Sequence, residues 1–115
     1  RYYGFDLFET TKKKEVMERL KKTGAHIWLF KGDTRNVLPR VIKTLPKMDL
    51  IYIDGGHSYD VVKSDWINAE KLMHKHTVVV FHDYGVEEGV TRVVEEIDPK
   101  KYDITVKRIC WVKVK

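Results

Sequence analysis

Residues 50–60 read LIYIDGGHSYD, and residues 77–85 read TVVVFHDYG. In both stretches a short apolar run ends in a histidine and an aspartate instead of in ordinary turn residues. Continuous apolar runs of this length are typical of parallel strands that are covered on both faces. The two stretches therefore predict two strands of one sheet, each of which places a carboxylate and an imidazole at its carboxyl end.

The rest of the chain repeats this alternation of strand and helix. Apolar runs predict strands at residues 2–5, 27–30, 50–53 and 78–81. Apolar residues spaced by three and four predict helices that include residues 16–20, 37–45, 59–73 and 90–97. Residues 102–107 and 109–114 predict an antiparallel hairpin joined around Lys107 and Arg108. The fold class is therefore α/β: one domain, residues 1–115, with a Rossmann-like open, mainly parallel sheet and a C-terminal antiparallel hairpin.

Composition excludes several classes of protein. The 115 residues are 43% hydrophobic and 34% charged, which is typical of one small soluble domain. No apolar run approaches the roughly 20 residues that a membrane helix needs. The net charge of +5 comes largely from lysine-rich stretches that we interpret as solvated faces, and no motif supports binding of nucleic acid. Cys110 is the only cysteine, so we expect a buried thiol, no internal disulfide and a reducing, cytoplasmic compartment.

Acidic side chains follow all four predicted parallel strands. Carboxyl ends of parallel strands meet at one rim of a sheet, where ligands of open α/β sheets bind. Carboxylates gathered there need a cation, a hydroxyl or an amine among them. We therefore expect one cluster at this rim, made of Asp6, Asp33, Asp54, His57 and Asp83.

The DGGH segment allows two interpretations. Gly55 and Gly56 are expected to let the backbone turn sharply and bring His57 back beside Asp54. Alone, the segment is equally compatible with a glycine-rich loop whose histidine caps the next helix. The FHD sequence after the following strand favours a functional site.

Other polar and aromatic residues are expected to have structural roles. Ser58 and Asn36 are candidate helix N-caps, and Pro39 is expected in a first helical turn. His74 and His76 are expected at the C-terminus of a helix, where cations suit the helix dipole. The remaining expectations are a solvated helix face with Lys63 and Asp65, and core positions for Trp28, Trp66 and Trp111.

Four segments in order resemble a known family. They are YGFDLFE (3–9), KGDT (31–34) followed by VLP (37–39), IDGGHSYDVVKSDW (53–66), and VVVFHDY (78–84) followed by GVTRVVEE (89–96). Together they resemble class I S-adenosylmethionine-dependent methyltransferases, and more narrowly the macrocin O-methyltransferase group. That group carries an IDGxHxY segment and an HD or ED pair after the next strand. The order and spacing of the segments, over nearly the whole chain, carry the resemblance.

The resemblance implies S-adenosylmethionine as the cofactor. Asp6 matches the acidic residue that holds the ribose hydroxyls of the cofactor. Gly32, Asp33 and Thr34 match the segment that contacts the adenine. The resemblance also implies that Asp54 takes part in binding the cofactor.

The resemblance also implies the chemistry. Asp54 and Asp83 match carboxylates that bind Mg²⁺ in the metal-dependent members, and His82 stands where some members carry glutamate. Because Mg²⁺ prefers oxygen ligands, His82 is a poor direct substitute for that carboxylate. His57 matches a general base that deprotonates a hydroxyl of a small-molecule acceptor, which then attacks the sulfonium methyl.

One family feature has no counterpart in this sequence. The family domain begins with a strand that leads into a glycine-rich loop around the methionine end of the cofactor, and none of the seven glycines forms a G-x-G after a strand. We therefore expect the C-terminal portion of an incomplete methyltransferase domain. The strands at 2–5 and 50–53 would then either pair directly or leave open edges, which invite a homodimer.

Two alternatives remain. A catalytically incomplete methyltransferase-like domain could serve as a binding or assembly module. FDLFETT also resembles the first motif of haloacid-dehalogenase-type phosphatases, with Asp6 as nucleophile. The interval from Thr10 to Lys31 is too short for the other motifs of those phosphatases, and IDGGH would go unexplained.

Overall fold

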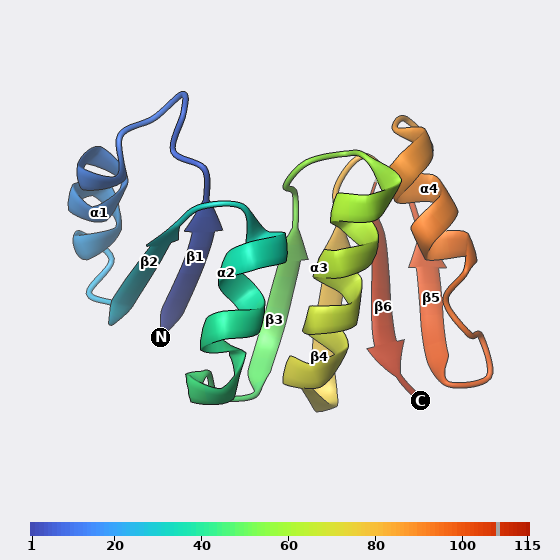
Figure 1. Ribbon diagram of the computed structural model, residues 1–115. Coiled ribbons are helices and arrows are strands. Elements are labelled where there is room, and N and C mark those ends of the chain that lie inside the picture. Colours follow the sequence, from blue (N-terminus) through green and yellow to red (C-terminus); the bar gives the residue numbers. More distant parts are fainter. Residues whose placement is uncertain (108) are drawn as a thin grey trace. The chain divides into compact units, whose positions relative to one another are not determined.

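The computed structural model describes residues 1–107 and 109–115 (Figure 1). Its elements are β1 (Tyr2–Asp6), α1 (Lys13–Lys21), β2 (Ile27–Lys31), α2 (Thr34–Val41), the 3₁₀ turn η1 (Ile42–Thr44), β3 (Met48–Ile53), α3 (Tyr59–Leu72), β4 (Met73–Phe81), α4 (Glu88–Glu95), β5 (Tyr102–Val106) and β6 (Cys110–Val114). The chain divides into two compact units, Arg1–Arg40 and Val41–Lys115, each described by itself below. The prediction of a single domain stays a prediction. Within the described residues, no helix is long and apolar enough to cross a bilayer.

The first unit is built on two parallel strands. β1 pairs with β2 from Tyr2 opposite Ile27 to Asp6 opposite Lys31. Aromatic side chains stack across this pair, with ring centroids 4.8 Å apart for Tyr3 and Trp28. The predicted core position of Trp28 is wrong, because 42% of this side chain is exposed. The parallel pairing nevertheless confirms that both strands deliver their carboxyl ends to the same edge.

The second unit is a four-stranded sheet in the order β3-β4-β6-β5. β3 and β4 are parallel, whereas β6 is antiparallel to both β4 and β5. The predicted α/β fold with parallel strands and a C-terminal antiparallel hairpin is confirmed, although this sheet is mixed and Arg108 lies outside the described residues. β1 and β3 belong to different units, so the two predicted alternatives, direct pairing of these strands or open edges, stay predictions. The predicted homodimer stays a prediction.

Helices α3 and α4 lie on one face of this sheet and enclose the core with it (Figure 1). Fully buried side chains come from the strands and from both helices, and include Val62, Phe81, Val93, Cys110 and Val112. Burying an apolar side chain of this size contributes about 1.5–3 kcal/mol. The core therefore holds α4 firmly against the sheet, close to the carboxyl ends of β3 and β4.

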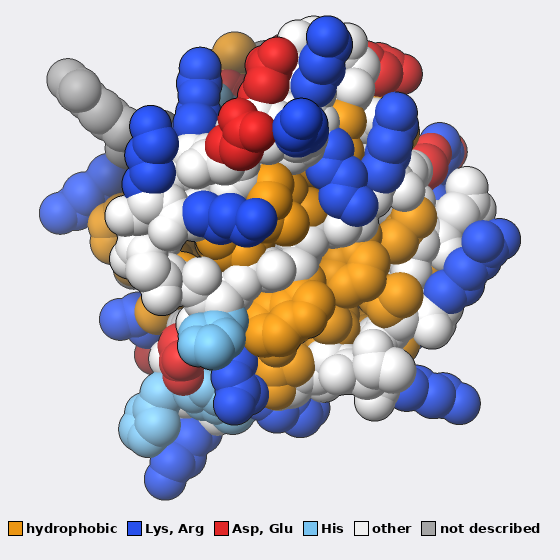
Figure 2. Space-filling model, turned by 90° about the vertical axis from the view of Figure 1, so that its left-hand side faces the viewer, with side chains coloured by type: hydrophobic (Ala, Val, Ile, Leu, Met, Phe, Trp, Pro, Cys, Tyr) orange, Lys and Arg blue, Asp and Glu red, His pale blue; other side chains and the backbone are white. Residues whose placement is uncertain are grey.

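The opposite face of β3 is exposed. Leu50 and Tyr52 alternate with the half-buried Ile51 and the buried Ile53, and they are 63% and 55% exposed. The expectation that this strand is covered on both faces is therefore wrong. Figure 2, a view from another side, also shows hydrophobic side chains gathered at the surface, with basic, acidic and histidine side chains around them.

Two element boundaries differ from the predictions. β4 begins at Met73, directly after α3, so His74 and His76 lie in a strand and not at a helix C-terminus. Long-range contacts stabilise this early start, because the Thr77 hydroxyl donates to the Met48 carbonyl and the His74 Nε2 lies 2.9 Å from Asp49 Oδ1. Helix α2 begins at Thr34, so Asn36 is not its cap.

Pro39 lies inside α2 and not in its first turn. Proline lacks the N–H that would bond four residues back, and α2 ends two residues later, where the chain tightens into η1.

Candidate functional site

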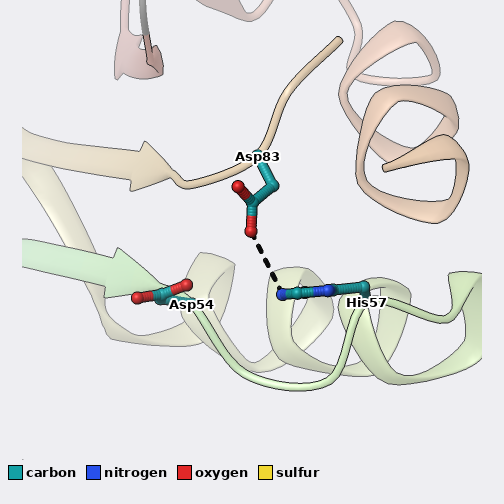
Figure 3. A group of neighbouring side chains, drawn as sticks. All are labelled: Asp54, His57 and Asp83. Carbon is teal, nitrogen blue, oxygen red and sulfur yellow. Dashed lines mark ion pairs between the residues drawn. The ribbon is translucent and has the colours of Figure 1, made fainter. Parts of the chain in front are cut away.

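The carboxyl ends of β3 and β4 bring three potential ligands together. Ile53 lies opposite Phe81 in the parallel ladder, and the backbone N–H of His82 continues this pairing by donating to the Ile53 carbonyl at 3.1 Å. Donor atoms of Asp54, His57 and Asp83 all lie within 4.8 Å of one another (Figure 3). The prediction that Asp54 and Asp83 share one rim is confirmed.

The His57 imidazole lies between two carboxylates. Its Nε2 is 3.2 Å from Asp83 Oδ2, the pair drawn with a dashed line in Figure 3, and its Nδ1 is 3.5 Å from Glu87 Oε1. The side chain is 43% exposed, so a bound molecule can reach it. Sequence reasoning missed Glu87; the only signal was its position directly before α4.

His82 contacts both strand-end carboxylates. Its Nδ1 lies 2.9 Å from Asp83 Oδ2 and 3.2 Å from Asp54 Oδ1. The interaction with Asp83 raises the pKa of His82, desolvation opposes this rise, and the charge of Asp54 adds to it. When it is protonated, this imidazole offsets part of the repulsion between the two carboxylates.

The backbone of Asp83 turns sharply after β4. Its φ of +62° lies in the left-handed region, which residues other than glycine rarely adopt. Its carbonyl accepts from the backbone N–H groups of Val86 and Glu87 at 3.1 and 3.0 Å, which leads the chain into α4. Such a conformation persists only where surrounding contacts enforce it, and it is found at ligand-binding sites more often than elsewhere.

The glycines of DGGH act differently from the prediction. Neither Gly55 nor Gly56 has a left-handed φ, so a sharp glycine-only turn is not their role. A Cβ on Gly55 would lie 3.4 Å from Asp65 Oδ2, and one on Gly56 would lie 3.3 Å from Val61 Cγ1. The loop therefore packs closely on α3. Asp65, expected on a solvated face, is only 8% exposed.

The two acidic residues of the first unit make local contacts. Asp6 Oδ1 accepts from the Phe8 backbone N–H at 2.6 Å, and Asp33 Oδ1 accepts from the Arg35 N–H at 2.9 Å. The Arg35 Nε also donates to both Asp33 oxygens at 3.0 and 3.1 Å. These hydrogen bonds from Arg35 lower the pKa of Asp33. Whether Asp6 and Asp33 join the cluster of the second unit stays a prediction.

Gly32, between these residues, has a φ of +140°. A Cβ there would also lie 2.8 Å from Val37 Cγ2, in the first part of α2. Glycine therefore permits the tight passage from β2 into α2, which Thr34 begins. Sequence reasoning missed Arg35, whose partner lies only two residues away.

The cluster fits a hard divalent cation in part. Asp54 and Asp83 offer the carboxylate oxygens that Mg²⁺ prefers, whereas the neighbouring nitrogens of His57 and His82 are poor Mg²⁺ ligands. The two carboxylates are thus the residues that could hold Mg²⁺, with the imidazoles beside them.

Comparison with known proteins gives one family match. A family model described as a methyltransferase domain matches residues 1–84, which is more than half of the chain. No curated protein matches the sequence.

Several solved structures are similar. CalS11, a TDP-rhamnose 3'-O-methyltransferase in calicheamicin biosynthesis, matches with a TM-score of 0.80 and 17% identity over 98% of this chain and 58% of its own. The O-methyltransferase TomG from Streptomyces achromogenes, solved with SAM, matches with 0.70 and 15% over 100% of this chain and 73% of its own. MycE methyltransferase, solved with Mg and SAH, matches with 0.69 and 11% over 99% of this chain and 45% of its own. Identities this low show a shared fold, and this chain spans less than two thirds of CalS11.

Proposed function

We propose that this chain is part of an S-adenosylmethionine-dependent O-methyltransferase. The chain belongs to the methyltransferase-domain family, whose model matches residues 1–84, and it has the Rossmann-like fold of class I methyltransferases. The proposed acceptor is a hydroxyl group of a small molecule. The observation that carries this proposal is the convergence of Asp54, His57 and Asp83 within 4.8 Å at the carboxyl ends of two parallel strands.

The proposed reaction is a direct displacement. The acceptor oxygen forms a bond to the methyl carbon while the bond from that carbon to the sulfonium sulfur breaks. The sulfur keeps the electron pair, which leaves S-adenosylhomocysteine as a neutral thioether. His57, whose half-exposed imidazole lies beside Asp83, takes the hydroxyl proton.

Most of the proposed cofactor contacts lie in the first unit, and Asp54 of the second unit is proposed as a further one. Asp6 would hold the ribose hydroxyls through its carboxylate. The segment of Gly32, Asp33 and Thr34 would contact the adenine. Because the Asp33 carboxylate already accepts from Arg35, we assign that contact to backbone groups of the segment.

Mg²⁺ is proposed as an assisting ion. Asp54 and Asp83 would hold it, and His82 would remain beside them without being a ligand. When bound, the ion supplies positive charge that favours the deprotonated form of the acceptor hydroxyl. A reducing, cytoplasmic location agrees with the buried free thiol of Cys110 and stays a prediction.

Two measurements on the full-length protein test the proposal. Calorimetric titration with S-adenosylmethionine should show binding, and incubation with simple phenols and sugars as probe acceptors should release S-adenosylhomocysteine. Activity should fall when Mg²⁺ is removed by a chelator, and full activity in excess chelator would remove the metal from the proposal. Binding without release for any hydroxyl probe would favour the binding-module alternative.

A further inference from the structure

Helix α4 touches the backbone of His57 directly. A Cβ on Gly89 would lie 2.2 Å from the His57 carbonyl oxygen, 2.6 Å from the Tyr59 nitrogen and 2.8 Å from the Ser58 carbonyl carbon. All three atoms belong to the backbone, so no side-chain rotation can make room. Only glycine at this position lets α4 approach the chain that carries His57.

Side chains reinforce this contact around the first turn of α3. The Arg92 guanidinium lies over the Tyr59 ring, 4.2 Å from its centroid. The Tyr59 hydroxyl donates to Glu96 Oε2 at 2.8 Å, and the Lys63 ammonium donates to the same oxygen at 2.8 Å. Tyr59 is two residues from His57, so these contacts hold the site loop as well as the helix.

Glu87, the residue that precedes α4, contacts the imidazole ring of His57. Glu87 Oε1 is 3.5 Å from His57 Nδ1, on the opposite side of the ring from the contact between Nε2 and Asp83. The ring therefore has a carboxylate on each side, Asp83 at Nε2 and Glu87 at Nδ1. Two acceptors on opposite sides hold an imidazole ring in one orientation.

We propose that the start of α4 positions His57: Gly89 fixes the location of its backbone, and Glu87 fixes the orientation of its ring. The positioning is a property of the second unit, and its value for catalysis rests on the function proposed above. Glu87 and Gly89 are positioning residues, because they act through His57 and not on the reacting atoms.

Three variants of the full-length protein test the role of Glu87. NMR signals of the His57 ring report its orientation and surroundings. Glu87→Ala removes the carboxylate beside Nδ1, so it should shift these signals and lower kcat for S-adenosylhomocysteine formation about tenfold, with KM for S-adenosylmethionine unchanged. Glu87→Gln should keep both properties close to those of the wild type, because its amide oxygen can still face Nδ1.

The matched control is Glu88→Ala, which removes the same charge from the neighbouring exposed position of α4. It should leave the His57 signals and kcat unchanged. Wild-type His57 signals in Glu87→Ala would overturn the proposed role of Glu87. His57 signals that respond as expected, in a protein that forms no S-adenosylhomocysteine, would keep the positioning and sink the proposed function.

Gly89→Ala tests the backbone contact. It should move the His57 backbone and ring signals and lower kcat, although alanine normally stabilises a helix relative to glycine. Gly24→Ala is the control: Gly24 has a φ of +74° and no atom within 4 Å of an added Cβ, so the substitution should lower Tm without moving the His57 signals. Unchanged His57 signals in a folded Gly89→Ala variant would overturn the backbone part of the proposal, and the Glu87 series decides the remainder even if this variant does not fold.

Discussion

The strand-end carboxylates of the two units are used in different ways. In the first unit, Asp6 and Asp33 each bond a group two residues away in the chain. In the second unit, His57 contacts Asp83 and Glu87 from another strand end and from the start of α4. Local bonds shape the loop that carries the acid, whereas the long-range contacts bring together groups that no local segment could supply. The comparison teaches that aspartates at similar strand ends in a sequence need not have similar contacts in the structure.

The largest expected effect follows from removing the imidazole of the long-range cluster. His57→Ala should lower methyl transfer by about 10²–10⁴, the typical contribution of a positioned general base. The side chain is half-exposed, so Tm should change little. Release of S-adenosylhomocysteine and thermal unfolding, measured side by side, check this. Normal turnover by the variant would show that His57 is not the general base, and that the long-range cluster of the second unit has no catalytic role.

A smaller effect is expected from Asp54→Asn. The amide keeps the shape of the carboxylate but loses the charge that Mg²⁺ and His82 would share. Methyl transfer should fall about 10- to 100-fold, as is typical when a metal site is perturbed. Titrating MgCl₂ against activity should show a weaker apparent affinity in the variant. An unchanged Mg²⁺ dependence would place the ion elsewhere.

For the local contacts the expected effect is on stability. Asp33→Ala removes the acceptor for the Arg35 N–H at the start of α2 and should lower Tm by a few degrees. Asp33→Asn should retain most of that stability, since asparagine caps helices about as well as aspartate. Comparing Tm of the two variants distinguishes the contribution of the helix-capping hydrogen bond from that of the negative charge of Asp33. Equal losses in both variants would show that the ion pair, and not the cap, matters at this strand end.

The smallest expected effect is a pH dependence of stability. Because the folded-state pKa of His82 is raised above its ordinary value of about 6.5, its contribution is fully present below that value and is lost as the pH rises through the folded-state pKa. Tm of the metal-free protein should therefore decline over this range, and His82→Gln should flatten the decline. His76→Gln, at an exposed position of β4, is the control and should keep the wild-type slope. The same slope in His82→Gln and wild type would contradict the assignment.

The sequence predicts the order of strands and helices well, because each of these elements follows from a local pattern of apolar residues. Continuous apolar runs mark every parallel strand, and helical spacing marks every helix between them. The sequence misplaces the start of β4, since apolar spacing continues to Met73 and only the contacts of Thr77 and His74 with β3 show where the strand begins. Partners far apart in the chain decide such boundaries.

The candidate site follows the same rule. Asp54, His57 and Asp83 could be predicted from strand ends, because parallel strands must share a rim. Glu87 could not, since its contact with His57 depends on how closely α4 approaches the loop. That approach depends on Gly89, whose requirement appears only when the surrounding backbone atoms are known.

Position 83 has to meet two requirements, a left-handed backbone conformation and a negative charge beside His57. Glycine and asparagine tolerate that conformation, and each is one nucleotide change away from an aspartate codon. Either change would keep the turn into α4 and remove the negative charge beside His57. A lineage carrying this domain therefore has a short mutational route from a proposed enzyme to a folded, catalytically silent protein, and a scan of all substitutions at position 83 should accept more residues when selecting for folding than when selecting for turnover.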